Sequence, residues 1–112
     1  MKRSLLAIIL AMIAAPAWAH AKLQSSDPPA NSSVKSPSLI RLVFSENLEP
    51  AFSGATLSDA AGKKLPVPAS VGGTTITLMP LALKPGTYKV SWHSVGHDTH
   101  RITGTFSFKV VP

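Results

Sequence analysis

Three of the four histidines in this 112-residue chain lie within eight residues of one another near its C-terminal end. They are His93, His97 and His100, and Asp98 stands between the last two. Asp98 and His100 are two residues apart, a spacing that directs both side chains to one face of an extended backbone. Imidazole and carboxylate together suit Cu(II), Zn(II) or Ni(II) better than soft Cu(I). We therefore predict a metal site that uses Asp98 and His100.

The fourth histidine, His20, follows a segment that has the features of a secretory signal peptide. Lys2 and Arg3 follow Met1, an apolar run covers residues 5–15, and residues 17–19 read Ala-Trp-Ala, a small-x-small cleavage pattern. The apolar run is shorter than the roughly 20 residues that a transmembrane helix needs. The sequence thus predicts a signal peptide at residues 1–19 and one exported domain at residues 20–112.

Cleavage after residue 19 would make His20 the first residue of the mature protein. Its α-amino nitrogen and its imidazole Nδ1 could then close a six-membered chelate ring on one metal ion. His100 would add a third nitrogen, and Asp98 or water would complete the tetragonal plane that Cu(II) prefers. Such an arrangement would be a histidine brace, and we predict that His20 forms one metal site with Asp98 and His100.

Other interpretations of these residues stay open at this stage. Ala19-His20-Ala21 is itself a small-x-small pattern, and cleavage after Ala21 would remove the proposed ligand. Asp98 could instead cap a turn through the backbone. His93 has the strand parity of the outer face, and His97 is out of phase with the two predicted ligands. We expect neither His93 nor His97 to bind the metal directly.

Composition excludes several classes of protein. The predicted mature chain has nine Lys and Arg against five Asp and Glu, a net charge of about +4. These charges are scattered in the sequence and form no Lys/Arg cluster with interleaved aromatic residues, which argues against nucleic-acid binding. The basic balance favours solubility, or weak docking to an acidic membrane surface or partner. The chain has no cysteine, which excludes disulfides and thiolate chemistry. Because no nucleophile or acid/base pair is apparent, we predict no catalytic residues and no enzymatic activity.

The pattern of apolar residues predicts a small all-β domain. Apolar and polar residues alternate over short segments, and ten prolines and seven glycines separate these segments. We expect about seven strands in a Greek-key β-sandwich similar to immunoglobulin or cupredoxin architectures. The expected strands cover residues 20–27, 39–44, 54–58, 63–67, 74–79, 88–93 and 106–111.

Six motifs are spread over nearly the whole of the predicted mature chain. They are His20-Ala21-Lys22-Leu23, Ser26-Asp27-Pro28, residues 42–48 (LVFSENL), residues 83–92 (LKPGTYKVSW), Asp98-Thr99-His100 and residues 104–108 (GTFSF). In this combination the chain resembles the CopC/PcoC family of periplasmic copper-resistance proteins, including its short YobA-type members.

The resemblance implies a seven-stranded, cupredoxin-like β-sandwich that carries or stores copper in the periplasm. It implies that His20, Asp98 and His100 are the Cu(II) ligands, and that Glu46 lies close to the site without binding the metal. It also suggests a CopD-type inner-membrane copper protein as a partner. We expect a monomer that binds copper and no nucleic acid.

Some features depart from the family pattern. Gly96-His97 and Arg101 replace the residues more usual beside the Asp-x-His motif, and such changes could loosen the loop or add a competing imidazole. Some family members have a methionine-rich loop that binds Cu(I). Here Met79 is the only methionine in residues 56–79, so we expect no Cu(I) site.

Two other functional classes are also compatible with the sequence. One is a copper-dependent oxygenase that uses the same brace, and the other is an immunoglobulin-like interaction module whose histidines bind no metal.

Overall fold

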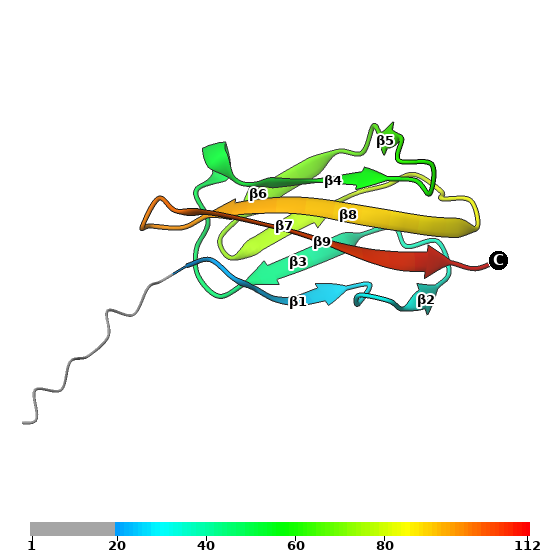
Figure 1. Cartoon of the computed structure of the whole chain (residues 1–112), viewed down its shortest axis with the longest axis horizontal. Coiled ribbons are helices and arrows are strands. Elements are labelled where there is room, and N and C mark those ends of the chain that lie inside the picture. Colours follow the sequence, from blue (N-terminus) through cyan, green and yellow to red (C-terminus); the bar gives the residue numbers. More distant parts are fainter. Residues whose placement is uncertain (1–19) are drawn as a thin grey trace, which may run out of the picture.

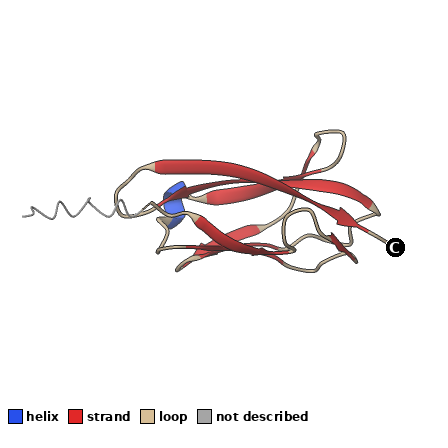
Figure 2. Cartoon of the chain, turned by 60° about the horizontal axis from the view of Figure 1, so that its bottom comes forward, coloured by secondary structure: helices blue, strands red, loops and turns tan. Residues whose placement is uncertain are grey.

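The protein folds into two β-sheets that face each other, as Figures 1 and 2 show for the computed structural model. The structure describes residues 20–112, and the predicted signal peptide lies outside the described residues. One sheet has the strand order β1-β3-β7-β6 and the other has the order β2-β9-β8-β4-β5. The predicted all-β sandwich is therefore confirmed. The strands are β1 (Leu23–Asp27), β2 (Ser33–Val34), β3 (Ile40–Phe44), β4 (Gly54–Ser58), β5 (Lys64–Leu65), β6 (Ala69–Gly72), β7 (Thr75–Leu78), β8 (Gly86–Val95) and β9 (Arg101–Val110).

A single 3-10 turn, η1 (Pro50–Phe52), is the one helical element among residues 20–112. None of the described residues form a helix with the length and apolar character needed to cross a bilayer.

Each of the seven predicted segments contains a strand, but β2 and β6 were not predicted. β6 has the sequence Ala-Ser-Val-Gly, which carries little apolar periodicity, and it forms because the turn at Gly73 folds it back against β7. β2 is only two residues long and pairs in parallel with the end of β9. That pairing joins distant parts of the chain, so no local pattern predicts it.

The core lies between the two sheets and consists of the inward-facing side chains of the strands. Buried and exposed side chains alternate most regularly in β8 and β9. In this hairpin Tyr88 pairs with Phe108 and Val90 pairs with Phe106, and all four side chains are buried. Trp92, the next inward-facing residue of β8, is also buried. The remaining core residues include Ile40, Leu42, Phe44, Leu57, Ile76, Leu78 and Val110, each at most 2% exposed. This apolar interior rigidly supports the loops at both ends of the sandwich.

Strand directions bring the N-terminus of the described chain next to the loop that joins β8 and β9. β8 and β9 pair along ten residues, from Gly86↔Val110 to Val95↔Arg101, and residues 96–100 close this hairpin. β1 runs antiparallel to β3 and begins at the same end of the sandwich, where His20 enters (Figure 1). We call this end, which carries His20 and residues 96–100, the site end, and we call the opposite end the distal end.

The indole ring of Trp92 packs directly over Gly104, its partner across the β8–β9 ladder. A Cβ atom at position 104 would lie 2.6 Å from Cε2 of this ring. The ring is 9% exposed and meets Phe44 edge to face at a centroid distance of 5.2 Å, which restricts its movement. We expect Gly104→Ala to lower the free energy of unfolding by about 1–3 kcal/mol, as overpacking of a core does. Urea denaturation of the mature protein measures this change.

Gly72→Ala is the matched control, because a Cβ atom there meets no atom within 4 Å. We expect that variant to change stability by less than about 0.5 kcal/mol, as exposed substitutions usually do. Equal effects of the two substitutions would show that Gly104 is not required by the packing of Trp92.

Candidate metal centre

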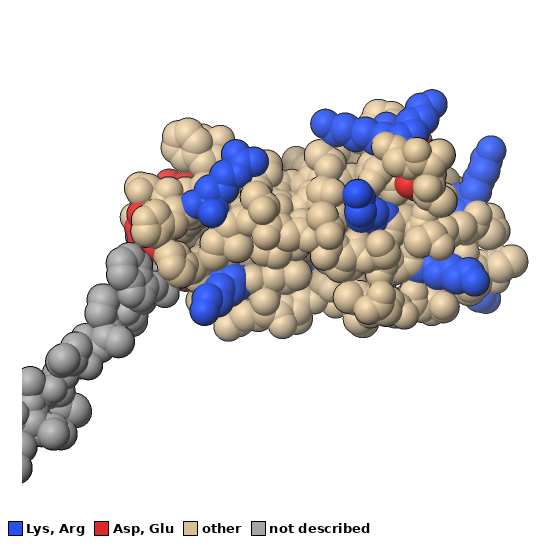
Figure 3. Space-filling view, in the orientation of Figure 1, with Lys and Arg blue, Asp and Glu red and all other residues tan. Residues whose placement is uncertain are grey.

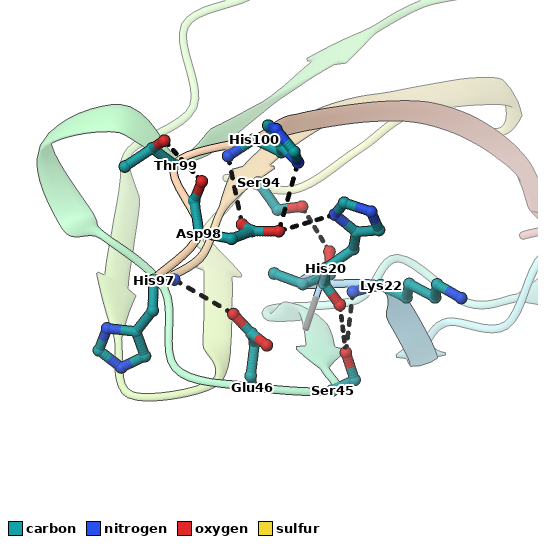
Figure 4. Close-up of polar contacts among 10 residues, drawn as sticks. His20, Lys22, Ser45, Glu46, Ser94, His97, Asp98, Thr99 and His100 are labelled. Carbon is teal, nitrogen blue, oxygen red and sulfur yellow. Dashed lines mark hydrogen bonds and ion pairs between the residues drawn. The ribbon is translucent and has the colours of Figure 1, made fainter. Parts of the chain in front are cut away.

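Three side chains from opposite ends of the chain converge at the site end (Figure 4). His20 Nδ1 lies 2.9 Å from Asp98 Oδ2, and His100 Nδ1 lies 3.5 Å from the same oxygen. The two imidazole rings are 5.2 Å apart between centroids. The structure thus brings together the three residues that the sequence proposed as ligands.

The geometry of this group suits a small metal ion. One ligand atom from each of the three residues lies within 4.8 Å of the other two. Two ligand atoms bound at about 2 Å and at right angles are separated by about 2.8 Å, which is close to the 2.9 Å between His20 Nδ1 and Asp98 Oδ2. His100 is more exposed, with 56% of its side chain accessible, so its ring has room to close the remaining distance.

The carboxylate of Asp98 has two separate tasks. Oδ1 accepts a hydrogen bond from the backbone N–H of His100 at 3.2 Å, so the alternative that Asp98 caps a turn is realised. Oδ2 is a buried atom that faces the two histidine nitrogens. Turn capping therefore orients the second oxygen toward the candidate metal position.

The prediction that an extended backbone places Asp98 and His100 on one face is wrong. An extended backbone was expected, but Thr99 adopts the left-handed conformation with φ of 62°. The Thr99 N–H donates to the carbonyl of Gly96 at 3.1 Å, so residues 96–99 form a turn. This turn, rather than strand alternation, places Asp98 and His100 beside each other.

Two serines hold the N-terminal segment at the site. Ser94 is fully buried in β8, and its hydroxyl donates a 2.6 Å hydrogen bond to the carbonyl of Ala21. Ser45 donates through Oγ to the carbonyl of His20 and accepts from the N–H of Lys22, both at 2.9 Å. His20 is therefore positioned through its own carbonyl and through the backbone of the two residues that follow it. The strand expected from residue 20 starts only at Leu23, because residues 20–22 are held by these side chains.

Glu46 and His97 lie next to the ligand group but contact each other instead of the three ligands. Glu46 Oε1 accepts a hydrogen bond from the backbone N–H of His97 at 3.2 Å, and its side chain lies against Gly96 where a Cβ atom would otherwise stand. The imidazole of His97 is exposed and points away from Asp98 in Figure 4. Glu46 thus supports the turn, and the small residue at position 96 makes that contact possible.

Sequence reasoning missed the serines that position the site. Besides Ser94 and Ser45, the hydroxyl of buried Ser53 accepts from the N–H of Val95 at 3.0 Å, where β8 ends. Ser94 carried a usable signal, since it shares the inward parity of Trp92 yet is polar. A buried hydroxyl needs a hydrogen-bond partner, so a contact with another segment could have been expected. The partner itself could not be identified, because Ala21 is distant in sequence.

His93 lies on the outer face of the β8–β9 sheet, as its parity predicted. It pairs with Gly54 and Thr103 in the neighbouring strands. It also lines a groove with Phe52 and Arg101. Partial burial and the nearby Arg101 guanidinium both lower the pKa of His93, and burial is the larger cause.

Ser94→Ala tests the backbone anchor. The change removes the hydrogen bond to Ala21 and leaves a buried carbonyl without this donor, so we expect a loss of about 1–3 kcal/mol in unfolding free energy. Ser91→Ala is the matched control in the same strand, because Ser91 is only partly buried and faces outward. Chemical denaturation of both variants makes the comparison. If Ser94→Ala is as stable as Ser91→Ala, the anchor does not contribute.

The lowered pKa of His93 predicts how stability depends on pH. The folded protein favours the neutral form of His93. The contribution of His93 to the free energy of unfolding is therefore complete above the ordinary pKa of 6.5, and it is lost as the pH falls from there through the lowered pKa of the folded state. We expect His93→Gln to remove this part of the acid destabilisation. Arg101→Gln should reduce it without removing it, because burial is the larger cause. Denaturation midpoints at several pH values measure the effect, and a His93→Gln curve parallel to that of the wild type would contradict it.

Comparisons with known proteins place the chain in a family. A family model described as the CopC domain matches residues 23–111. Copper resistance protein C of Pseudomonas syringae pv. tomato is 43% identical over 109 residues, which cover 88% of this chain and 86% of that protein. Protein YobA of Escherichia coli strain K12 is 40% identical over 115 residues, which cover 96% and 93% of the two chains.

Solved structures agree with the sequence relatives. CopC from Methylosinus trichosporium OB3b superimposes with a TM-score of 0.78 at 31% identity, covering 83% of this chain and 95% of that chain. PcoC from Escherichia coli, described as a methionine-rich copper resistance protein, gives a TM-score of 0.72 at 42% identity, with coverage of 83% and 100%. Together with the two-sheet fold described above, these similarities show that the chain belongs to the CopC domain family.

Proposed function

We propose that this protein serves copper resistance or homeostasis in the periplasm by binding one Cu(II) ion per chain through His20, Asp98 and His100. The observation that carries the proposal is the meeting of His20 with Asp98 at 2.9 Å, although 77 positions separate them in the sequence. Two imidazoles and a carboxylate form a nitrogen and oxygen donor set that suits Cu(II). The names of the relatives, copper resistance protein C, support the same role.

The family match begins at residue 23 and so does not include His20, whose role as a ligand rests on other observations. Its support is geometric: Ser45 holds the carbonyl of His20, Ser94 holds that of Ala21, and the His20 ring faces Asp98. Cleavage after residue 19 would release the α-amino group of His20 at this same place. The amine and Nδ1 would then both be available to one ion, which completes the proposed brace.

The proposed cargo is Cu(II) alone. PcoC is described as methionine-rich, whereas the only methionine in residues 20–112 here is Met79. Met79 follows the end of β7, at the distal end of the sandwich and away from the site. One thioether offers too few soft ligands for a tight Cu(I) site, so we propose none.

We propose carriage or storage of copper rather than catalysis. A carboxylate in the donor set stabilises Cu(II) and disfavours the reduction that oxygen activation requires. A CopD-type membrane protein as the recipient, and a monomeric state, stay predictions from the family resemblance.

The experiment is Cu(II) titration of the mature protein that begins at His20, followed by electron paramagnetic resonance. We expect His100→Ala to weaken Cu(II) binding by at least about 100-fold and to change the spectrum, because a direct ligand should matter at least as much as the groups that orient ligands. His97→Ala is the matched control, since it removes a neighbouring imidazole that points away from the site. It should leave the affinity and the spectrum unchanged.

The role of the N-terminus is tested in the same assay. A mature protein with one glycine added before His20 keeps the imidazole but converts the amine into an amide, and it should lose the spectrum of the brace. N-terminal sequencing of the exported protein should begin at His20. Unchanged binding in His100→Ala would refute the ligand assignment, and copper-dependent oxidation well above that of free copper would favour the oxygenase alternative.

A further inference from the structure

Lysines gather at the distal end, far from the metal centre. The β8 strand begins there and β4, β7 and β9 end there, so the adjoining segments 33–39, 59–68 and 79–85 lie together around this end. Four lysines of these segments are exposed, and we call them the distal lysine cluster: Lys35, Lys63, Lys64 and Lys84. Exposed Lys89 and Lys109 extend the cluster along β8 and β9.

Most acidic side chains in view gather at the site end, on the left of Figure 3, whereas basic side chains lie along the whole length of the molecule. Three of the five acidic residues, Glu46, Glu49 and Asp98, are at the site end, where Glu49 donates its N–H to the carbonyl of Val95. Of the two other acidic residues, Asp59 accepts backbone hydrogen bonds from Ala61 and Lys63, and Asp27 stands opposite Arg41 across β1 and β3. The distal end thus presents a mainly positive surface.

Exposed apolar side chains lie among the distal lysines. Leu81 is 86% exposed, and Leu39 and Met79 are 44% and 42% exposed, so three of the four exposed large apolar residues in the described chain are at this end. Leu39 and Met79 flank the register pair Ile40↔Leu78. An apolar side chain that stays in water contributes no hydrophobic free energy to folding. A cluster of such exposed side chains therefore indicates an interaction surface.

The loop that carries Leu81 is held in place rather than free. Leu83 donates its N–H to Ser36 Oγ at 2.8 Å, which joins this loop to the segment of Lys35. The hydroxyl of Tyr88 donates to the carbonyl of Lys84 at 2.7 Å. Leu81 and Lys84 also border a shallow groove of about 360 Å³ shared with Leu65, next to Lys64. Leu81 and Lys84 therefore share one surface, which Asp59 also borders, and the Leu83–Ser36 contact brings the segment of Lys35 beside it.

We propose that the distal end docks on the surface of an anionic phospholipid bilayer, with the distal lysine cluster at the headgroups and Leu81 inserted into the interface. Lysines around a protruding apolar side chain match a surface that is negative outside and apolar beneath. Tyr88 at this end is 7% exposed and so offers no stacking platform for a nucleic acid. Insertion of Leu81 explains its exposure, which charge attraction alone would leave unexplained.

Docking in this orientation would leave the site end facing the aqueous compartment. The metal centre would stay accessible to copper ions while the protein is bound. Transfer of copper to an integral membrane protein would then require release from the bilayer, which suits a storage state. The proposal does not depend on the identity of the bound metal.

Vesicle sedimentation with the mature protein tests the proposal. We expect binding to vesicles of phosphatidylcholine mixed with phosphatidylglycerol, no binding to phosphatidylcholine alone, and release by salt. Lys35→Ser combined with Lys84→Ser should lower partitioning about 25-fold, at about fivefold for each lysine. Lys22→Ser combined with Arg101→Ser removes the same charge at the site end and should lower it much less.

A second variant separates membrane docking from unspecific attraction to polyanions. Leu81→Ser should weaken vesicle binding about fivefold, because an apolar side chain leaves the interface, and should leave retention on a heparin column unchanged. Thermal unfolding of each variant should match that of the wild type, since every substituted side chain is exposed. Equal losses for the two double variants, or wild-type vesicle binding by Leu81→Ser, would overturn the proposal.

Discussion

The continuous pairing of β8 with β9 is the constraint on which the candidate site depends. Ten register pairs join the two strands, and their inward side chains contribute much of the apolar core. Because both strands are held along their full length, the five residues that connect them have little freedom. The turn at Gly96 and Thr99 then presents Asp98 and His100 from a rigid support, which is the arrangement that a precise metal site needs.

The other half of the site is delivered by an ordinary edge strand with polar anchors. A bulge between Leu23 and Ser25 interrupts the pairing of β1 with β3, and residues before it are held by Ser45 and Ser94. The two halves meet only when the sandwich has closed, since they come from opposite ends of the domain. Metal bound between them would favour the folded state, because an unfolded chain cannot bring these ligands together.

The two ends of the molecule differ in chemistry. The site end combines three acidic residues with imidazoles, and the distal end combines lysines with protruding apolar side chains. The β-sandwich keeps these ends apart, because the long strands run from one end to the other and the segments that connect them lie at the ends (Figure 2). The proposed copper binding and the proposed surface docking would therefore use different residues of the same small domain.

Local patterns in the sequence were sufficient to predict the fold class and seven of the nine strands, since alternation in segments such as residues 39–44 and 88–93 reports directly which side chains are buried. They also marked Asp98 and His100 as candidates, because the residue types and their nearness in sequence are visible without a structure. Tertiary structure decided the rest. The hydrogen bond from His97 to Glu46, the one from Ser94 to Ala21 and the distance from His20 to Asp98 all depend on contacts between segments that no local pattern encodes.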